Sequence, residues 1–191
     1  MPNTLISGSS TRAREVAAAL QAGDWPPPLC VDTVAALGDA CDSMPPNSLD
    51  CYIQLPSERR AHTTALTEAS AMVADGAMAR YAAVARVAPV LSDTATVVLV
   101  MGDGADPTLP RDLAGAVNDL TRVLARALRN DHRATDLRVT LVRDEESPSE
   151  IASIARSPRD GTPPMDWYVD FEPALGSADW RCEVLSLLEE I

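Results

Sequence analysis

Residues Thr94–Met101 read TATVVLVM, and this stretch decides the fold class. The run is rich in β-branched side chains, has no charged residue and is followed by Gly102. A strand that is apolar on both faces belongs in the middle of a parallel sheet, where helices cover each side. The stretch therefore predicts a sheet that lies between two helical layers.

The segments on either side of it alternate between strand and helix patterns. Further strands are expected at Thr4–Ser7, Leu29–Asp32, Leu49–Leu55, Leu137–Val142 and Trp167–Phe171. Helices are expected at 10–21, at 34–44 after the cap Thr33, at 64–91 with a break near Asp75–Gly76, at 111–129, from Ser147–Pro148, and at 176–191. This order predicts one α/β domain over residues 1–191: three α/β/α layers, Rossmann-like, with a doubly wound, mostly parallel sheet of about six strands.

The composition limits the partners and the chemistry. The 191 residues carry a formal charge of −12, and this acidic balance disfavours nucleic acid and anionic membranes as partners. The sequence contains no lysine, which excludes Schiff-base chemistry and any Tyr–Lys catalytic pair. No signal-peptide pattern is present, so we expect a cytoplasmic protein without a metal site, in which Cys30, Cys41, Cys51 and Cys182 are reduced.

Several motifs in the same order resemble the short-chain dehydrogenase/reductase (SDR) family. The matching stretches are 5–14 (LISGSSTRAR) for the glycine-rich turn, 30–33 (CVDT), 49–53 (LDCYI), 88–89 with 95–100, 120–128 (LTRVLARAL) and 167–170 (WYVD). The resemblance implies a single Rossmann domain, in which the helices at 64–91 and 111–129 form a four-helix interface between two subunits.

The departures from the family pattern fall on its functional positions. Arg12 and Arg14 stand where the family has the second and third glycines of its dinucleotide turn. The family's Tyr, Lys, Ser and Asn positions fall on Pro110, Ala114, Gly102 or Asp103, and about Asp75. None of these residues can perform the family's proton relay. The resemblance therefore implies a truncated, degenerate member without catalytic residues.

The first turn and the end of the second strand are the candidate cofactor site. Its residues are Ser7, Gly8, Ser9, Ser10, Thr11, Arg12 and Asp32. Hydroxyls and amides at a helix N-terminus hold phosphates, and an acidic residue after the second strand binds a ribose. We nevertheless expect no cofactor, because the two arginines crowd the turn and acidic residues follow the strands, namely Asp32, Asp103, Asp106, Asp144, Glu145, Glu146 and Asp170.

Association is the function that the pattern favours. The 64–91 helix is apolar nearly all round, so it has to be covered on more than one side. The predicted interface residues are Met78, Tyr81, Ala85, Val117, Leu120, Leu124 and Leu128. We predict a non-catalytic SDR-like pseudoenzyme that pairs with itself or with an active SDR paralogue.

Two alternatives stay open. The Ser7–Arg12 loop is similar to the GSxR loop of flavodoxin-like FMN reductases, which suggests a flavin- or nucleotide-binding oxidoreductase that uses FMN or NAD(P). The acidic residues after the strands suggest a binding module for a small cationic or apolar ligand.

Overall fold

The computed structural model describes residues 3–56, 64–102, 111–132, 134–143, 146–156 and 169–170. Its centre is a six-stranded sheet with the strand order β2-β1-β3-β4-β5-β6. The strands are β1 (Thr4–Ser7), β2 (Leu29–Val31), β3 (Leu49–Gln54), β4 (Leu91–Val100), β5 (Arg138–Val142) and β6 (Val169–Asp170). Neighbouring strands run parallel except β6, which is antiparallel to β5. The predicted α/β Rossmann-like fold is confirmed.

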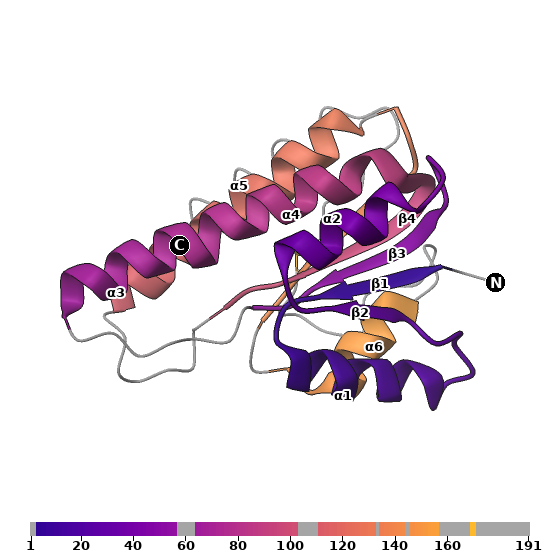
Figure 1. Ribbon diagram of the computed structural model, residues 1–191, viewed down its shortest axis with the longest axis horizontal. Helices are drawn as coiled ribbons and strands as arrows, with labels where there is room; N and C mark the ends of the chain where they lie inside the picture. Colours follow the sequence, from indigo (N-terminus) through magenta and orange to yellow (C-terminus); the bar gives the residue numbers. More distant parts are fainter. Residues whose placement is uncertain are drawn as a thin grey trace.

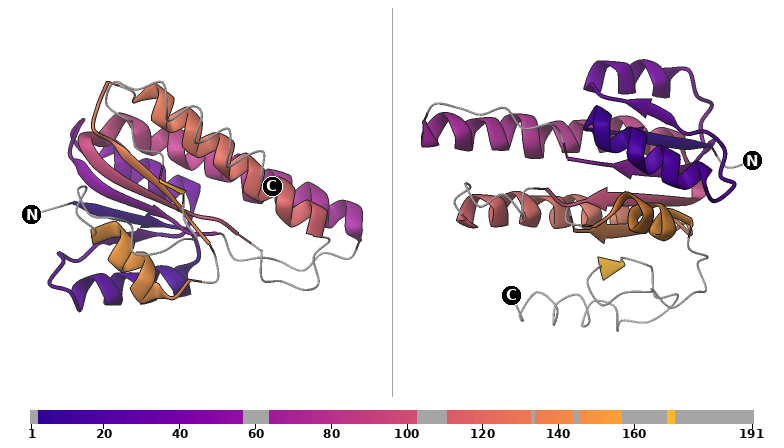
Figure 2. Two further views of the ribbon diagram at one scale, coloured as in Figure 1. Left: turned by 180° about the vertical axis from the view of Figure 1, so that it is seen from behind. Right: turned by 90° about the horizontal axis from the view of Figure 1, so that it is seen from below.

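Helices cover both faces of this sheet (Figure 1). They are α1 (Ser10–Gln21), α2 (Val34–Asp42), α3 (Ala65–Ala71), α4 (Ala79–Val87), α5 (Arg111–Asp131) and α6 (Pro148–Arg156). The views in Figure 2 agree that α2, α4 and α5 lie on one face and α1 and α6 on the other. Among the described residues, no helix is long and apolar enough to cross a membrane.

The central strand behaves as its sequence predicts. Val97, Val98, Leu99 and Val100 are all fully buried. Val97 and Leu99 pack under α2, α4 and α5, whereas Val98 and Val100 pack against α1 and α6. Because successive side chains of a strand point to opposite faces, one apolar run supplies both halves of the core.

Polar side chains cap two of the helices as expected. Thr33 Oγ1 accepts a hydrogen bond from the Ala36 amide at 3.1 Å and so caps α2. Ser147 and Glu150 form a reciprocal capping box: the Ser147 amide donates to Glu150 Oε2 at 2.8 Å, and the Glu150 amide donates to Ser147 Oγ at 3.3 Å. At α1, however, the N-cap residue is Ser9, not Ser10 or Thr11.

The break expected near Asp75–Gly76 is a π-helical segment. Between α3 and α4 the chain forms η1 (Met72–Met78), and a short 3₁₀ turn, η2 (Ala88–Val90), follows α4. Asp and Gly are weak formers of regular α-helix, which is consistent with the change in winding at this point. The helical path therefore continues from α3 through η1 into α4 (Figure 1).

Several expectations change or lie outside the described residues. Cys30 is exposed rather than part of the core, whereas Cys41 and Cys51 are buried, and all three are free. The expected apolar face of α2 loses Val34, whose side chain is 44% exposed. The helix at 176–191 with Cys182 lies outside the described part of the chain, as do the residues that flank Val169–Asp170.

Candidate functional site

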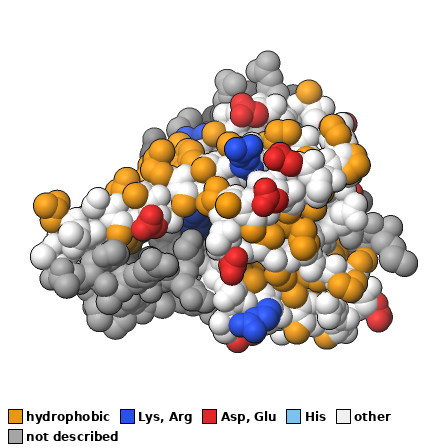
Figure 3. Space-filling view, in the orientation of Figure 1, with side chains coloured by type: hydrophobic (Ala, Val, Ile, Leu, Met, Phe, Trp, Pro, Cys, Tyr) orange, Lys and Arg blue, Asp and Glu red, His pale blue; other side chains and the backbone are white. Residues whose placement is uncertain are grey.

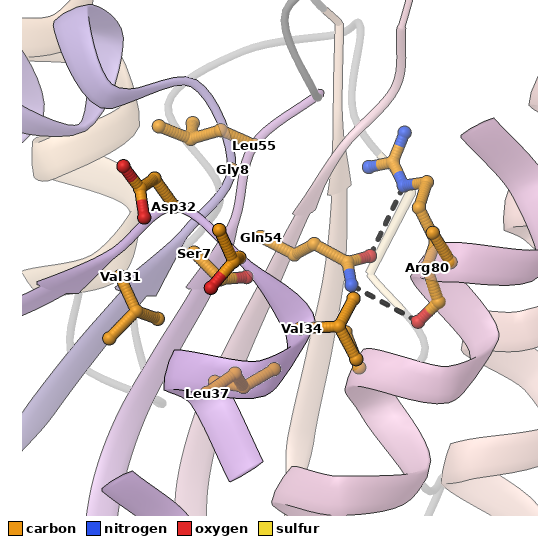
Figure 4. Close-up of a pocket in the computed structure, with 12 residues that line it drawn as sticks. Ser7, Gly8, Val31, Asp32, Val34, Leu37, Gln54, Leu55 and Arg80 are labelled. Atoms are coloured by element: carbon orange, nitrogen blue, oxygen red, sulfur yellow. Dashed lines mark hydrogen bonds between the residues drawn. The ribbon is translucent and has the colours of Figure 1, made fainter. Parts of the chain in front are cut away.

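A small crevice lies at the carboxyl ends of β1, β2 and β3, between α2 and α4. Its volume is about 40 Å³, and its lining residues include Ser7, Gly8, Asp32, Gln54 and Arg80. Figure 4 shows Val34 and Leu37 of α2 facing this space, with Arg80 reaching in from α4. Ligands of open α/β sheets bind outside the carboxyl ends of the strands. The volume suits a few water molecules rather than a drug-sized ligand.

Gly8 is required by the packing of the sheet. It has a φ of +118°, and a Cβ atom at this position would lie 2.4 Å from the carbonyl oxygen of Leu55. No side chain fits at that distance, and a positive φ strains any residue other than glycine. The glycine that resembles a cofactor-binding residue therefore has a structural reason of its own.

Two backbone amides of the first turn form hydrogen bonds within the chain. The Gly8 amide donates to the Val31 carbonyl at 3.2 Å, and the Ser9 amide donates to the Pro56 carbonyl at 3.1 Å. These two amides therefore already have acceptors at the turn where a phosphate would bind. Ser10 and Thr11 are exposed at the start of α1.

The two arginines of the turn also contact the chain itself. The Arg12 guanidinium donates to the Glu146 carbonyl at 2.9 Å, across to the segment that precedes α6. The Arg14 Nε donates to the Ser10 carbonyl at 3.0 Å, on its own helix. Both side chains thus brace α1.

The structure brings only some of the predicted cofactor residues together. Ser7, Gly8 and Asp32 line the crevice, and Asp32 is exposed there. Ser9, Ser10, Thr11 and Arg12 lie at the start of α1 and are not part of the lining.

A buried polar network forms the floor of the crevice. Ser7 Oγ and Tyr52 Oη are 2.7 Å apart, and Gln54 Nε2 donates to Tyr52 Oη at 3.2 Å. Gln54 also donates to the Arg80 carbonyl, and Arg80 Nε donates to Gln54 Oε1, each at 3.2 Å (Figure 4). A further guanidinium nitrogen of Arg80 donates to the Val100 carbonyl. These residues thus satisfy one another at the end of the sheet.

Burial has a clear electrostatic effect on this network. Removal from water raises the pKa of Tyr52 to about 12, even though the hydrogen bonds with Ser7 and Gln54 and the charge of Arg80 act in the opposite direction. The phenol therefore stays protonated at neutral pH. It bridges Ser7 and Gln54 through its hydrogen bonds.

Tyr52, Gln54 and Arg80 were not among the sequence-predicted site residues. One available signal was that Gln54 directly follows the apolar run Cys51–Ile53 at the end of its strand. Another was that Arg80 follows Ala77 by three residues and precedes Val84 by four, which places it on the buried side of the helix. Arg80 is 5% exposed.

The positions that match the family's catalytic residues are only partly described. Gly102 is buried near Pro56 and Arg80, and Asp75 is exposed in η1. Asp103 and Pro110 lie outside the described residues, and Ala114 belongs to α5. In the described ranges, no three His, Cys, Asp or Glu side chains gather as a metal site would require, and Asp106 lies outside those ranges.

The opposite side of α4, together with α5, forms a second candidate site. Met78 at the end of η1, Ala82 and Ala85 of α4, and Pro89 of η2 follow one another at helical spacing and are exposed. On α5, Ala116, Leu120, Val123 and Ala127 do the same. We call these eight residues the outer face. Figure 3 shows hydrophobic side chains gathered over this helical region.

The two helices of the outer face are joined directly. The Tyr81 hydroxyl donates to the Leu120 carbonyl at 2.9 Å. Met78 is 59% exposed, Val123 is 53% exposed and Leu120 is 38% exposed. Large apolar side chains of both helices therefore face solvent side by side.

Three of the predicted interface residues do not belong to this face. Val117, Leu124 and Leu128 are each at most 4% exposed and lie in the core beneath α5. The expectation that they contact a partner is corrected, because the chain itself covers them. Met78, Ala85 and Leu120 lie on the outer face, with the half-buried Tyr81 between the helices.

Comparison with solved structures supports the fold. A candidate short-chain alcohol dehydrogenase from Burkholderia multivorans superimposes with a TM-score of 0.62 at 13% identity, over 81% of this chain and 90% of the other. A double mutant of a Serratia marcescens short-chain dehydrogenase/reductase gives 0.60 at 14% identity, over 80% and 86% of the two chains. A candidate member from Burkholderia multivorans with bound NADP gives 0.58 at 12% identity, over 81% and 91%.

Comparison of the amino-acid sequence alone gives no match. No family model and no curated protein matches it. The structural likeness therefore establishes an SDR-like Rossmann fold, and the activity of the chain has to be argued from its own residues.

Proposed function

We propose that this chain is a non-catalytic protein with an SDR-like fold, a pseudoenzyme that works by association. Its outer face joins it to a second copy of itself or to an SDR-family paralogue. The observation that carries the proposal is the exposed double row of apolar side chains on α4 and α5. We place its site of action in the cytoplasm.

The outer face has the properties of a helix-packing surface. Five of its eight residues are Ala or Pro at the positions 82, 85, 89, 116 and 127, and small side chains allow helices to approach to about 8–10 Å. Monomeric soluble proteins rarely expose a contiguous apolar patch of this kind. A self-complementary patch favours a two-fold pairing of equal surfaces.

The charges around the outer face favour a second copy as the partner. Although the whole chain carries −12, the exposed or half-buried charges of this region are of both signs: Asp75, Asp119 and Asp131 against Arg86, Arg122 and Arg126. Two such faces meet without the like-charge repulsion that other surfaces of an acidic protein impose.

Residues that correspond to the family's catalytic and cofactor positions support the absence of catalysis that we propose. The sequence has no lysine, and the positions that resemble the family's Tyr and Lys are Pro110 and Ala114. Two amides of the first turn are bonded to Val31 and Pro56. A dinucleotide held in the family's manner would have to displace these bonds.

A co-expression experiment tests the association. We expect a tagged copy of the chain to retain an untagged copy on an affinity column, and we expect Leu120→Arg in both copies to abolish retention. Val34→Arg is the matched control, because Val34 is also exposed, at 44%, but lies on α2. Retention of Leu120→Arg, or loss of retention in Val34→Arg, would contradict the proposed face.

A binding experiment tests the loss of the cofactor site. We expect NADPH fluorescence and the thermal midpoint of the protein to stay unchanged when NADPH or FMN is mixed with the purified chain. A rise in the midpoint with FMN that Arg12→Ala removes would instead favour the flavin alternative. A rise with NADPH together with substrate turnover would refute the pseudoenzyme proposal.

A further inference from the structure

Arg126 of α5 is a half-buried charge at the border of the outer face. In the part of the chain that the structure describes, its Nε is shielded from solvent and has no hydrogen-bond partner. A shielded donor without an acceptor lowers stability, and the loss is larger for a charged group than for a neutral one. The guanidinium of Arg126 therefore favours a partner that brings an acidic acceptor to this border.

Arg126 and Asp119 lie on the same edge of the exposed side of α5. Successive residues of a helix are rotated by about 100°, so Asp119 and Arg126 lie about 40° and 60° from Val123 in one direction. Leu120 and Ala127 lie about 60° and 40° from it in the other direction. The Leu120 carbonyl accepts a hydrogen bond from α4. The exposed side of α5 therefore has an apolar edge beside α4 and a charged edge away from it.

Asp119 is the acidic group on this charged edge. Its side chain is 67% exposed, and Oδ1 lies 2.7 Å from Nη1 of Arg122, one turn further along α5. This contact orients the carboxylate but leaves it able to accept further hydrogen bonds, because an ionised carboxylate has about four acceptor sites. Seven residues, or about 10.5 Å along the axis, separate Asp119 from Arg126 of the same helix. Asp119 is therefore available to a cation from another molecule.

The spacing of these two charges is complementary to itself when a second α5 runs antiparallel. Asp119 precedes Val123 by four residues and Arg126 follows it by three, which correspond to about 6.0 and 4.5 Å along the helix. A two-fold axis beside Val123, at right angles to both helices, reverses the second helix and keeps both charged edges on the same side. Arg126 of each copy then lies level, within about 1.5 Å along the helix, with Asp119 of the other. A parallel pair would place like charges opposite each other.

We propose that two copies of this chain pair through antiparallel α5 helices, with Arg126 of each copy donating hydrogen bonds to Asp119 of the other. This pairing rests on the association proposed above and specifies its geometry. Val123 of one copy meets Val123 of the other at the centre, and the two ion pairs close the edge that faces away from α4. Because the partner shields these ion pairs from water, they help to select the partner and its register.

Charge reversal in the full-length chain tests this pairing. We expect Arg126→Glu and Asp119→Arg each to raise the dissociation constant of the homodimer at least about tenfold, because each creates two like-charge contacts. A mixture of the two variants restores two opposite-charge contacts, so we expect it to form a heterodimer about as tightly as wild type. A tagged Arg126→Glu chain should therefore retain untagged Asp119→Arg on an affinity column but not untagged Arg126→Glu.

Two further variants separate this contact from a general effect of charge. The chain that carries both Arg126→Glu and Asp119→Arg should form a homodimer again, which also shows that the substitutions leave the fold intact. Arg14→Glu is the matched control, because Arg14 is an exposed arginine of α1, on the other face of the sheet (Figure 2). It should leave the homodimer unchanged.

Three results would overturn the proposed contact while the association itself stands. Both single variants dimerise as tightly as wild type, the mixture of the two gives no heterodimer, or Arg14→Glu weakens the homodimer as much as Arg126→Glu does. A wild-type chain that stays monomeric in light scattering would instead overturn the self-association on which the pairing rests. The two failures are therefore distinguishable.

Discussion

α4 separates two surfaces of opposite character. On its inner side Ala79, Arg80 and Ala83 close a crevice whose polar groups bond to one another. On its outer side the outer-face residues Met78, Ala82 and Ala85 present apolar side chains to solvent. The polar groups of the buried network are thus satisfied within the chain, whereas the apolar side chains of the outer face are not covered by it.

The two surfaces differ in what a partner could gain by covering them. The four side chains of the buried network already bond to one another, so a ligand that used them would have to break internal bonds. The exposed apolar surface of α4 and α5 gains free energy when a partner covers it, at about 25 cal/mol per Å². The comparison supports the proposed association at the helices.

Gly8→Ala should have the largest effect on stability, and it tests why glycine is required at the end of β1. The new Cβ would lie 2.4 Å from the Leu55 carbonyl oxygen at a φ of +118°, so we expect a loss of about 4 kcal/mol. Urea unfolding measures it. In the matched variant Gly38→Ala the Cβ meets nothing within 4 Å inside α2, and we expect a gain of about 0.5–1 kcal/mol. A Gly8→Ala protein of normal stability would show that the glycine is kept for a ligand instead.

Neighbouring residues of α5 test the boundary between core and outer face. Leu124→Ala removes a side chain that is 4% exposed, so we expect a loss of about 3 kcal/mol. Val123→Ala removes one that is 53% exposed, and for a monomeric mutant background such as Leu120→Arg we expect less than about 0.5 kcal/mol. Thermal unfolding of both variants in that background checks this. Equal losses would mean that Val123 is covered by the chain itself.

The pH dependence of stability tests the buried network. Because burial raises the pKa of Tyr52 to about 12, the folded state keeps a proton that the unfolded state releases above its ordinary pKa near 10. The contribution is complete below pH 10 and is lost as the pH rises toward 12. We expect Tyr52→Phe to cost about 1–2 kcal/mol at pH 8 and to make the alkaline loss smaller.

Cys51 contributes to the same alkaline loss, since burial raises the pKa of its thiol to about 12 as well. Urea unfolding between pH 8 and 11.5 therefore should show a reduced, not abolished, slope in Tyr52→Phe. An unchanged slope would place Tyr52 in contact with water and would contradict the closed network.

Thr33→Ala should have a small effect, of the size that a helix cap contributes. Thr33 lines the crevice and also caps α2, with its hydroxyl 3.1 Å from the Ala36 amide. If capping is its role, the substitution costs about 1 kcal/mol and Thr33→Ser restores most of it. Thermal unfolding measures both. Equal stability of all three proteins would remove the cap as an explanation for this residue.

Local signals in the sequence predicted most of the fold. The both-face apolar run at 94–101, the cap Thr33 and the capping box at Ser147 and Glu150 each depend on residues close in the chain, and the structure confirms them. The winding of η1 was missed because the pattern at Asp75–Gly76 signals irregularity without stating whether the helix stops or widens.

The two candidate sites depend on packing between distant segments, which a single sequence does not encode in a local pattern. Tyr52, Gln54 and Arg80 meet across up to 28 positions and were not predicted. On α5 the apolar residues surround more than one side, so spacing alone did not separate the buried Leu124 from the exposed Val123. Burial in the folded chain makes that distinction.

The molar mass of the purified chain shows whether the outer face pairs with a second copy. Light scattering on wild-type protein, Val123→Arg and the control Val34→Arg, each from about 5 to 100 μM, would give the mass of each species. We expect twice the 20.3 kDa chain mass for wild type and Val34→Arg, and the single mass for Val123→Arg. A wild-type chain that stays at the single mass over this range, and does not pair with an SDR paralogue supplied to it, would contradict the account.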